Sequence, residues 1–204
     1  KYCRQAGVIL SFEQGDGGYY SDGFKTSWQY GTPSARQINK AASGSKAWKT
    51  NLSGNHNNLE LSYLYSPCFD ISQMTDPMLS FSAAIDIEDC GNGLCDGAYV
   101  ECSFDGKTWV RLGSTGQGTN WYDSTHNLWN SEGFTRWHVS SISLPQPGPG
   151  ETTHFRFVMS ADPGVALEGI AIDDIHVFDR ANRIYPASGV TATTRDISGS
   201  QRTD

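Results

Sequence analysis

Apolar and polar residues alternate along most of this chain, as they do in strands that bury one face. The longest alternating runs are Met78–Ile87, Thr153–Met159 and Gly169–Phe178. Shorter runs of the same kind are Gly7–Glu13, Ala47–Leu52, Leu59–Leu64, Ala98–Phe104, Thr108–Leu112 and Trp137–Leu144. Turn-forming residues separate the runs, and Asp105-Gly106 is a hairpin signal. The pattern predicts nine or ten strands and no convincing helix, which is typical of an all-β sandwich.

The pattern changes near the end of the chain. Residues 180–204 are polar and rich in Ser, Thr and Arg. We therefore expect one β-sandwich domain over residues 1–179, followed by an extended C-terminal tail that is a linker or the start of a following domain. Val190, Ala192 and Thr194 alternate with polar residues, so the tail is a candidate strand for docking on a sheet edge of its own domain or of another chain. A passive linker is the alternative.

Composition excludes two classes of partner. The chain has 204 residues, of which 37% are hydrophobic, 12% aromatic and 18% charged, and 22 are Gly, which suits short strands and tight turns. The net charge of −7 and the absence of a polybasic run argue against nucleic acid. No apolar stretch approaches the length of about 18 residues that crosses a membrane. The chain also starts without Met, so we expect it to be part of a larger multidomain protein.

The five cysteines predict two disulfide bridges and one free thiol. Cys90 and Cys95 enclose a short loop of turn formers and are expected to be bridged; two free thiols are the alternative, and zinc would lack ligands there. Cys102 lies on the predicted core face of its strand, so we expect a buried thiol. Cys3 and Cys68 then remain as the second pair. Two bridges indicate an oxidising compartment, so the protein is expected to be secreted, periplasmic or at the cell surface.

Several short motifs occur in an order that resembles the MAM and cleaved-adhesin families. These motifs are Ser11-Phe12-Glu13, Leu79-Ser80-Phe81, Ser103–Trp109, Phe155-Arg156-Phe157 and Gly169–Ile175. The segment Trp28–Asp70 is similar to the bacterial branch, and the likeness covers residues 7–178. The resemblance implies a jelly-roll (concanavalin-like) β-sandwich. It also implies a non-catalytic binding or adhesion module of a secreted or cell-surface bacterial protein, with a glycan or a protein as ligand.

A calcium site is the first chemical candidate. The first and last strands of a jelly roll lie near each other, which would bring Glu13 and Asp16 beside Asp173 and Asp174. Carboxylates and the carbonyls of a Gly-rich loop are the oxygen ligands that calcium prefers, and the resembling families carry a structural metal in about this place. Asp96 is a further candidate ligand. The alternative is that these carboxylates accept hydrogen bonds from backbone amides in turns.

The segment Asn120–Asn130 is the second candidate, because it combines aromatic and amide side chains between strands. Trp and Tyr rings stack on the apolar faces of sugars, and neighbouring Asn and Asp bind hydroxyl groups. We therefore predict a ligand-binding site at Trp121, Tyr122 and Trp129. The alternative is that these rings pack in the core.

Catalysis has weaker support. Asp86 and Glu88 lie two apart at a strand end, as in some sandwich-fold glycoside hydrolases, but the wider acidic pattern of those enzymes is absent. The five histidines are scattered, and neither an HExxH nor a GxSxG motif occurs. We therefore expect a non-enzymatic binding module. A structural or assembly module that docks on neighbouring chains is the alternative, and a glycoside hydrolase is the less favoured one.

Overall fold

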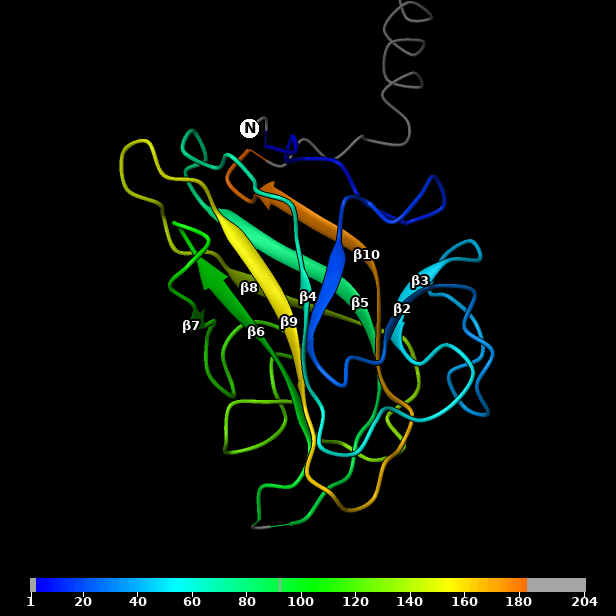
Figure 1. Ribbon diagram of the computed structural model, residues 1–204. Helices are drawn as coiled ribbons and strands as arrows, with labels where there is room; N and C mark the ends of the chain where they lie inside the picture. The colour runs from blue at the N-terminus through cyan, green and yellow to red at the C-terminus, as the bar shows by residue number, and fades with distance from the viewer. Residues whose placement is uncertain (1–2, 92, 183–204) are drawn as a thin grey trace, which may run out of the picture.

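The structure, a computed structural model, describes residues 3–91 and 93–182 and is built from strands (Figure 1). The ten strands are β1 (Tyr20–Phe24), β2 (Trp28–Gly31), β3 (Ala47–Thr50), β4 (Leu61–Tyr65), β5 (Pro77–Asp86), β6 (Gly97–Ser103), β7 (Val110–Arg111), β8 (His138–Ser143), β9 (His154–Ser160) and β10 (Gly169–Asp179). They form two five-stranded sheets in the orders β1-β4-β9-β6-β7 and β2-β3-β10-β5-β8, and every strand pair is antiparallel. The described residues contain no helix, and the predicted all-β jelly-roll sandwich is confirmed.

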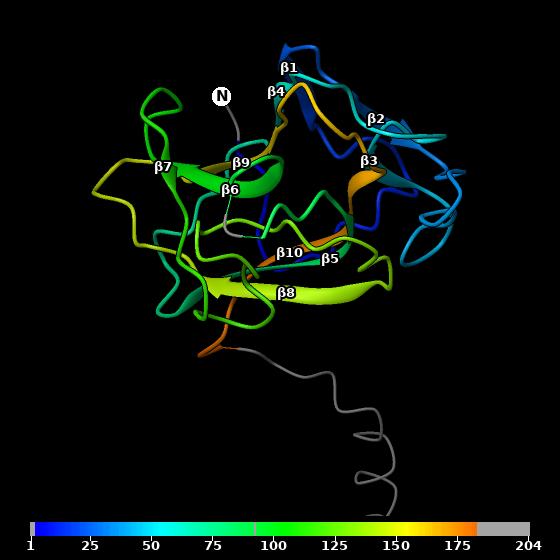
Figure 2. The same ribbon diagram turned by 90° about the horizontal axis from the view of Figure 1, so that it is seen from below.

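The two sheets lie face to face (Figure 2). Most connections change sheet: only β2–β3 and β6–β7 join consecutive strands of the same sheet. Alternation along each strand then sends one set of side chains into the space between the sheets. On β6, for example, Val100 and Cys102 point inward and are buried, whereas Tyr99 and Glu101 point outward and are partly exposed. The first sheet therefore has a separate outer face that is open to solvent.

Aromatic rings fill the middle of the core. The ring of Phe81 on β5 meets Trp121, Trp129 and Phe157 edge-on, with centroid distances of 5.8, 5.9 and 4.9 Å. Edge-to-face contacts of this kind are preferred by aromatic rings, and burying a Phe stabilises the fold by roughly 1.5–3 kcal/mol. The packed core thus supports the first sheet from its inner side.

The strands β5 and β10 are buried on both faces. Ala84 and Ala171 pack with Ile38 on the outer side of the second sheet, where Trp137 also contacts them. The loop that contains Ile38 is held there by Glu168, whose carboxylate accepts hydrogen bonds from the N–H groups of Gln37 and Ile38 at 2.8 Å. This loop covers the outer face of the second sheet near Ile38, which explains why Ala83–Ile85 and Gly169–Ile172 are apolar at successive positions.

Three expectations about the strands are corrected. Residues 7–13 do not form a strand: Leu10 makes one isolated bridge to Ile175, and Phe12 has a φ of 60°, which ends extended structure. The strands β1 and β2 were not predicted, because YSDGF and WQYG show no clear alternation of apolar and polar residues. The strand expected at Thr108–Leu112 is reduced to the two residues of β7.

Both predicted disulfides are confirmed. Cys3 is bonded to Cys68, and Cys90 is bonded to Cys95. Cys102 is a buried free thiol, and burial raises its pKa to about 11. The predicted tail strand at Val190–Thr194 lies outside the described residues. Within the part of the chain that is described, no helix is long and apolar enough to cross a membrane.

Candidate functional site: the outer face of the first sheet

The aromatic residues predicted to bind a ligand lie in the core, and this prediction is wrong. Trp121 and Trp129 are each 1% exposed, and Tyr122 is buried as well. Their polar atoms donate to backbone carbonyls: Trp121 Nε1 and the Tyr122 hydroxyl to Leu112 at 2.9 Å, and Trp129 Nε1 to Asn120 at 3.1 Å. The loop after β7 folds these rings inward, because large apolar rings whose N–H and O–H groups find partners are more stable there.

Aromatic side chains instead collect on the outer face of the first sheet. The strand register aligns Arg111, Glu101, Arg156, Tyr65 and Tyr20 in one row across β7, β6, β9, β4 and β1. Side chains that are direct cross-strand neighbours on one face contact one another. The row therefore runs across the full width of the sheet.

The tyrosines and the tryptophan of this face are in mutual contact. The rings of Tyr20 and Tyr65 are stacked, with centroids 5.0 Å apart and planes 12° apart. Trp109 meets Tyr65 edge-on at 5.5 Å, and Tyr63 lies 5.8 Å from the same ring. Tyr20 is 57% exposed and the other three are partly exposed. They form a continuous aromatic surface that reaches solvent.

Arg156 holds this surface together from its centre. Its guanidinium carbon lies 4.0 Å from the ring centroid of Tyr63 and 4.4 Å from that of Trp109. Its Nε and Nη2 atoms both lie 2.6 Å from Glu101 Oε2, and Nη1 donates to the Tyr65 hydroxyl at 2.9 Å. A partly buried guanidinium with a carboxylate partner and two aromatic faces has little freedom to move. The rings around it are therefore preorganised.

Arg111 extends the surface toward β7. Its guanidinium lies 3.4 Å from the ring centroid of Tyr99 and donates to the carbonyl of Asn127 at 2.8 Å. Burial, together with Glu101, raises the pKa of Tyr99, so its hydroxyl stays neutral. We call the whole set the aromatic face; it consists of Tyr20, Tyr63, Tyr65, Tyr99, Glu101, Trp109, Arg111 and Arg156.

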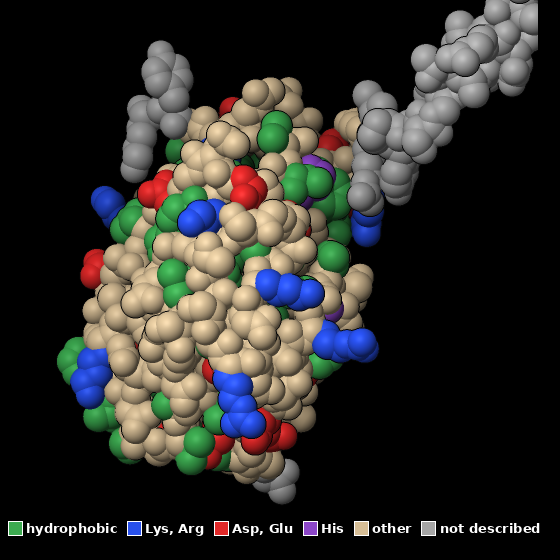
Figure 3. Space-filling model, turned by 90° about the vertical axis from the view of Figure 1, so that its right-hand side faces the viewer, with side chains coloured by type: hydrophobic (Ala, Val, Ile, Leu, Met, Phe, Trp, Pro, Cys, Tyr) green, Lys and Arg blue, Asp and Glu red, His purple; other side chains and the backbone are tan. Residues whose placement is uncertain are grey.

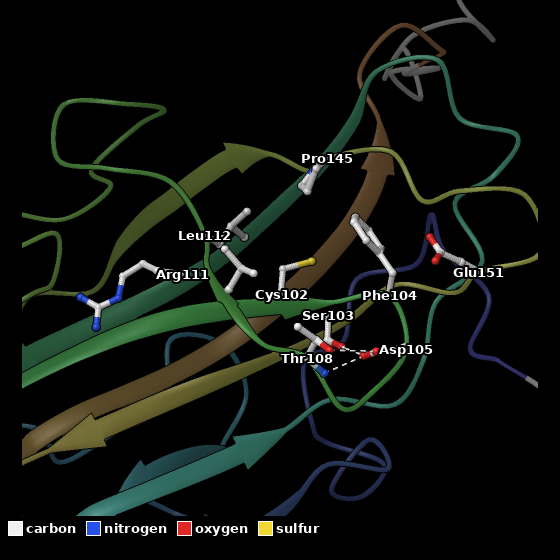
Figure 4. A pocket seen from close by; sticks show the side chains of 10 residues that line it. Cys102, Ser103, Phe104, Asp105, Thr108, Arg111, Leu112, Pro145 and Glu151 are labelled. Carbon is white, nitrogen blue, oxygen red and sulfur yellow. Dashed lines mark hydrogen bonds between the residues drawn. The ribbon is translucent and has the colours of Figure 1, made fainter.

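A cleft adjoins the aromatic face at Arg111 (Figure 4). It has a volume of about 420 Å³ and is mainly apolar, with Phe104, Leu112 and Pro145 in its lining. Figure 4 shows the Cys102 sulfur between Leu112 and Phe104, while Arg111 points away from the cleft. Because the Cys102 thiol is buried and neutral, it does not offer this cleft a thiolate nucleophile.

The aromatic face was missed because its residues lie at positions that alternation assigns to the solvent side. In β4, Leu64 points inward, and Tyr63 and Tyr65 flank it on the outer side. Polar residues are the usual occupants of such positions. The sequence did contain a signal, because two tyrosines occupy outward-facing positions of β4 and Tyr99 occupies an outward-facing position of β6.

Glu13 and Asp16, two of the predicted calcium ligands, accept hydrogen bonds from backbone amides. Glu13 Oε1 accepts from the N–H groups of Ser45 and Lys46 at 2.9 and 2.7 Å, and Oε2 accepts from the Ser45 hydroxyl at 3.1 Å. These bonds hold the pKa of Glu13 below its ordinary value. Asp16 accepts from the N–H of Gly18 at 2.9 Å, within its own turn.

Asp173 and Asp174 bind Ala42 and Ser43, just before the Ser45-Lys46 segment that Glu13 binds. Asp173 Oδ2 accepts from the N–H groups of Ala42 and Ser43 at 3.0 and 3.1 Å, and burial raises its pKa to about 7. Asp174 accepts from the Ser43 hydroxyl at 2.6 Å. Among the described residues, Asp173 and Asp174 do not form one carboxylate cluster with Glu13 and Asp16. Their donors fit the turn-binding alternative better than a metal centre, and calcium at these residues stays a prediction.

The two carboxylates weighed for catalysis have separate environments. Asp86 is buried, and its Oδ2 accepts hydrogen bonds from Gln37 Nε2 at 3.0 Å and from the N–H of Glu168 at 3.3 Å. Glu88 lies instead with Asp96 and Asp162. Asp86 therefore serves to fix a covering loop.

Comparison with known proteins supports the fold. No family model matches the chain. Bacillopeptidase F of Bacillus subtilis (strain 168) is 29% identical over 177 residues, which make up 86% of this chain and 11% of that protein. TmCBM61, solved in complex with β-1,4-galactotriose, has a TM-score of 0.51 at 14% identity and covers 84% of this chain and 95% of its own.

A second solved structure is the K1 cleaved adhesin domain of Lys-gingipain from Porphyromonas gingivalis W83. It has a TM-score of 0.50 at 16% identity and covers 85% of this chain and 98% of its own. At these identities the two solved structures show the fold alone, which is a β-sandwich. Membership of the MAM family stays a prediction.

Proposed function

We propose that this chain is a non-catalytic binding module that recognises a glycan on its aromatic face. The observation that carries the proposal is the solvent-facing aromatic face, in which Tyr65 contacts both Tyr20 and Trp109, and the guanidinium of Arg156 packs on Trp109. Aromatic rings offer apolar contact area to the C–H faces of sugar rings. The carboxylate of Glu101 and the guanidinium of Arg111 supply hydrogen-bonding groups at the same surface.

Preorganisation supports this proposal. Binding is weakened when side chains must be ordered on contact, and the ring contacts and the ion pair of Arg156 have already ordered this surface. The ligand solved in complex with TmCBM61, β-1,4-galactotriose, makes a galactan a reasonable first probe. A protein partner is the second candidate, because Tyr, Trp and Arg also dominate the centres of protein interfaces.

The setting proposed for the module is a secreted or cell-surface protein. The two disulfides form in oxidising compartments and so support this location. The chain spans 11% of bacillopeptidase F, which supports a role as one unit of a longer chain. The binding proposal does not depend on calcium, and the predicted structural calcium stays a prediction.

Glycan binding can be tested with a glycan array that includes β-1,4-galactan and acidic polysaccharides, followed by calorimetry on any glycan retained. Tyr65→Ala and Trp109→Ala should abolish the binding. Phe134→Ala removes an exposed ring outside the aromatic face and should leave binding unchanged. Binding that survives both of the first two variants, or an array on which the wild type retains nothing, would overturn the proposal.

A further inference from the structure

Three carboxylates from different parts of the chain meet at one end of the sandwich. Glu88 follows β5, Asp96 precedes β6, and Asp162 follows β9. One carboxylate oxygen from each lies within 4.8 Å of the other two. The two loops that carry them lie at the lower end of Figure 1, and acidic side chains are visible at the lower end of the face in Figure 3.

Asp96 is the buried member of this group. It is 1% exposed, and its Oδ1 accepts a hydrogen bond from the N–H of Asp162 at 2.8 Å. Its Oδ2 accepts no hydrogen bond. A buried carboxylate oxygen without a donor is costly, so a charged or polar partner is expected for it.

The neighbouring His56 cannot supply that donor. Its Nε2 lies 3.2 Å from Asp96 Oδ2, but the same Nε2 accepts the N–H of Leu167 at 3.3 Å. Its Nδ1 lies 3.2 Å from the carbonyl of Asn57, which places the ring proton on Nδ1. Nε2 therefore presents a lone pair to Asp96, and a proton on Nε2 would break its bond with Leu167.

The charge of the group is also uncompensated. Among the described residues, no Lys or Arg forms a salt bridge with Glu88, Asp96 or Asp162. Burial and the charges of Asp96, Asp162 and Glu132 raise the pKa of Glu88. Mutual repulsion of this kind is relieved when a cation binds between the carboxylates.

We propose that Glu88, Asp96 and Asp162 bind one calcium ion. Calcium bonds to oxygen at about 2.3–2.6 Å, so oxygens on opposite sides of one ion lie up to about 5 Å apart, and this group meets that limit. Cys90 and Cys95 are bridged and offer no thiolate, so the ligands are hard oxygens that favour calcium over zinc.

The ion would connect two loops that the fold only brings together. The disulfide loop between Glu88 and Asp96 is on one side, and the turn from β9 to β10, which carries Asp162, is on the other. This site is separate from the aromatic face and from the predicted calcium ligands Glu13, Asp16, Asp173 and Asp174. It accounts for a structural calcium through residues other than those predicted around Glu13.

The test is the number of calcium ions bound per chain. Protein freed of metal with EDTA is titrated with calcium chloride and followed by calorimetry and native mass spectrometry. The wild type should bind an ion that Asp162→Asn and Glu88→Gln no longer bind. Asp89→Asn makes the same charge change in the same loop, outside the cluster, and should bind as the wild type does. Glu13→Gln should also leave this ion in place.

Hydrogen exchange on the wild type gives a second readout that needs no variant. Calcium should slow amide exchange in residues 88–97 and 161–167 together. Equal calcium binding by wild type, Asp162→Asn and Glu88→Gln would overturn the proposal, as would a wild type that binds zinc but not calcium. An ion lost only in Glu13→Gln would assign the metal to the ligands predicted around Glu13, and this result would also overturn the proposal. None of these outcomes bears on glycan binding.

Discussion

Single side chains on the outer sheet do more than their strand positions suggest. Arg156 joins rings from β4 and from the loop before β7. Its guanidinium plane contacts Tyr63 and Trp109 while its nitrogens bind Glu101. Lysine carries the same charge but has neither the plane nor the fork of donors. The aromatic face therefore depends on the shape of this side chain as well as on its charge.

Arg156→Lys should lower glycan affinity while the protein stays folded. The lysine keeps a charge near Glu101, so the stability loss is expected to be about 1 kcal/mol, but the rings lose the plane that orders them. Calorimetry on the bound glycan and a urea denaturation curve measure the two effects. Unchanged affinity would show that the order of the rings is irrelevant to binding.

The buried rings of the loop after β7 have the opposite role. Trp129 packs edge-on against Phe81 and is closed off from solvent. Trp129→Ala should therefore lower the free energy of unfolding by roughly 3–5 kcal/mol. Trp109→Ala should lower it far less. Denaturation of both variants by urea checks this, and a mild effect at Trp129 would contradict its place in the core.

At the scale of elements, alternation predicted the long strands well and the short ones poorly. β5, β6, β9 and β10 each bury an inner face, and the pattern follows directly from that burial. β1 lies at a sheet edge with mainly exposed residues, so burial leaves no pattern in its sequence. Phe12 was expected in a strand, but its positive φ follows from tertiary packing that alternation does not encode. The cysteine pairs were predictable, because Cys90 and Cys95 enclose a short loop and Cys102 lies on the core face of its strand. Cys3 and Cys68 were then left as the second pair.

The turn from β6 to β7 has a pH dependence that can be measured. The N–H groups of Thr108 and Lys107 hold the pKa of Asp105 below its ordinary value. The folded pKa is lower than the unfolded one, so this stabilisation is present at neutral pH and is lost as the pH falls below about 4. Asp105→Asn should reduce that acid sensitivity.

Urea midpoints at about pH 7 and about pH 3 give the comparison. The difference between the two midpoints should be smaller in Asp105→Asn than in the wild type. An identical difference in both proteins would mean that the carboxylate of Asp105 does not stabilise the turn.

At the scale of the whole molecule, two disulfides constrain very different lengths of chain. Cys3 and Cys68 are 65 positions apart, and Cys90 and Cys95 are 5 apart. The loop-entropy relation gives about 4 kcal/mol for the long loop and about 2 kcal/mol for the short one. Replacing Cys3 and Cys68 by Ser should lower the melting temperature more than replacing Cys90 and Cys95, which calorimetry in EDTA can compare. The reverse order would contradict this.

The sandwich as a whole presents one sheet to solvent and covers part of the other with the Ile38 loop. That asymmetry leaves the outer face of the first sheet as the broad surface for a ligand, and the aromatic face occupies its width. The most direct test is nuclear magnetic resonance of the isotope-labelled chain titrated with the oligosaccharide that binds best on the array. We predict that chemical-shift changes concentrate at Tyr20, Tyr65, Trp109 and Arg156. Changes centred on the Asn120–Asn130 segment or on the cleft beside Cys102, with the aromatic face unaffected, would contradict the account.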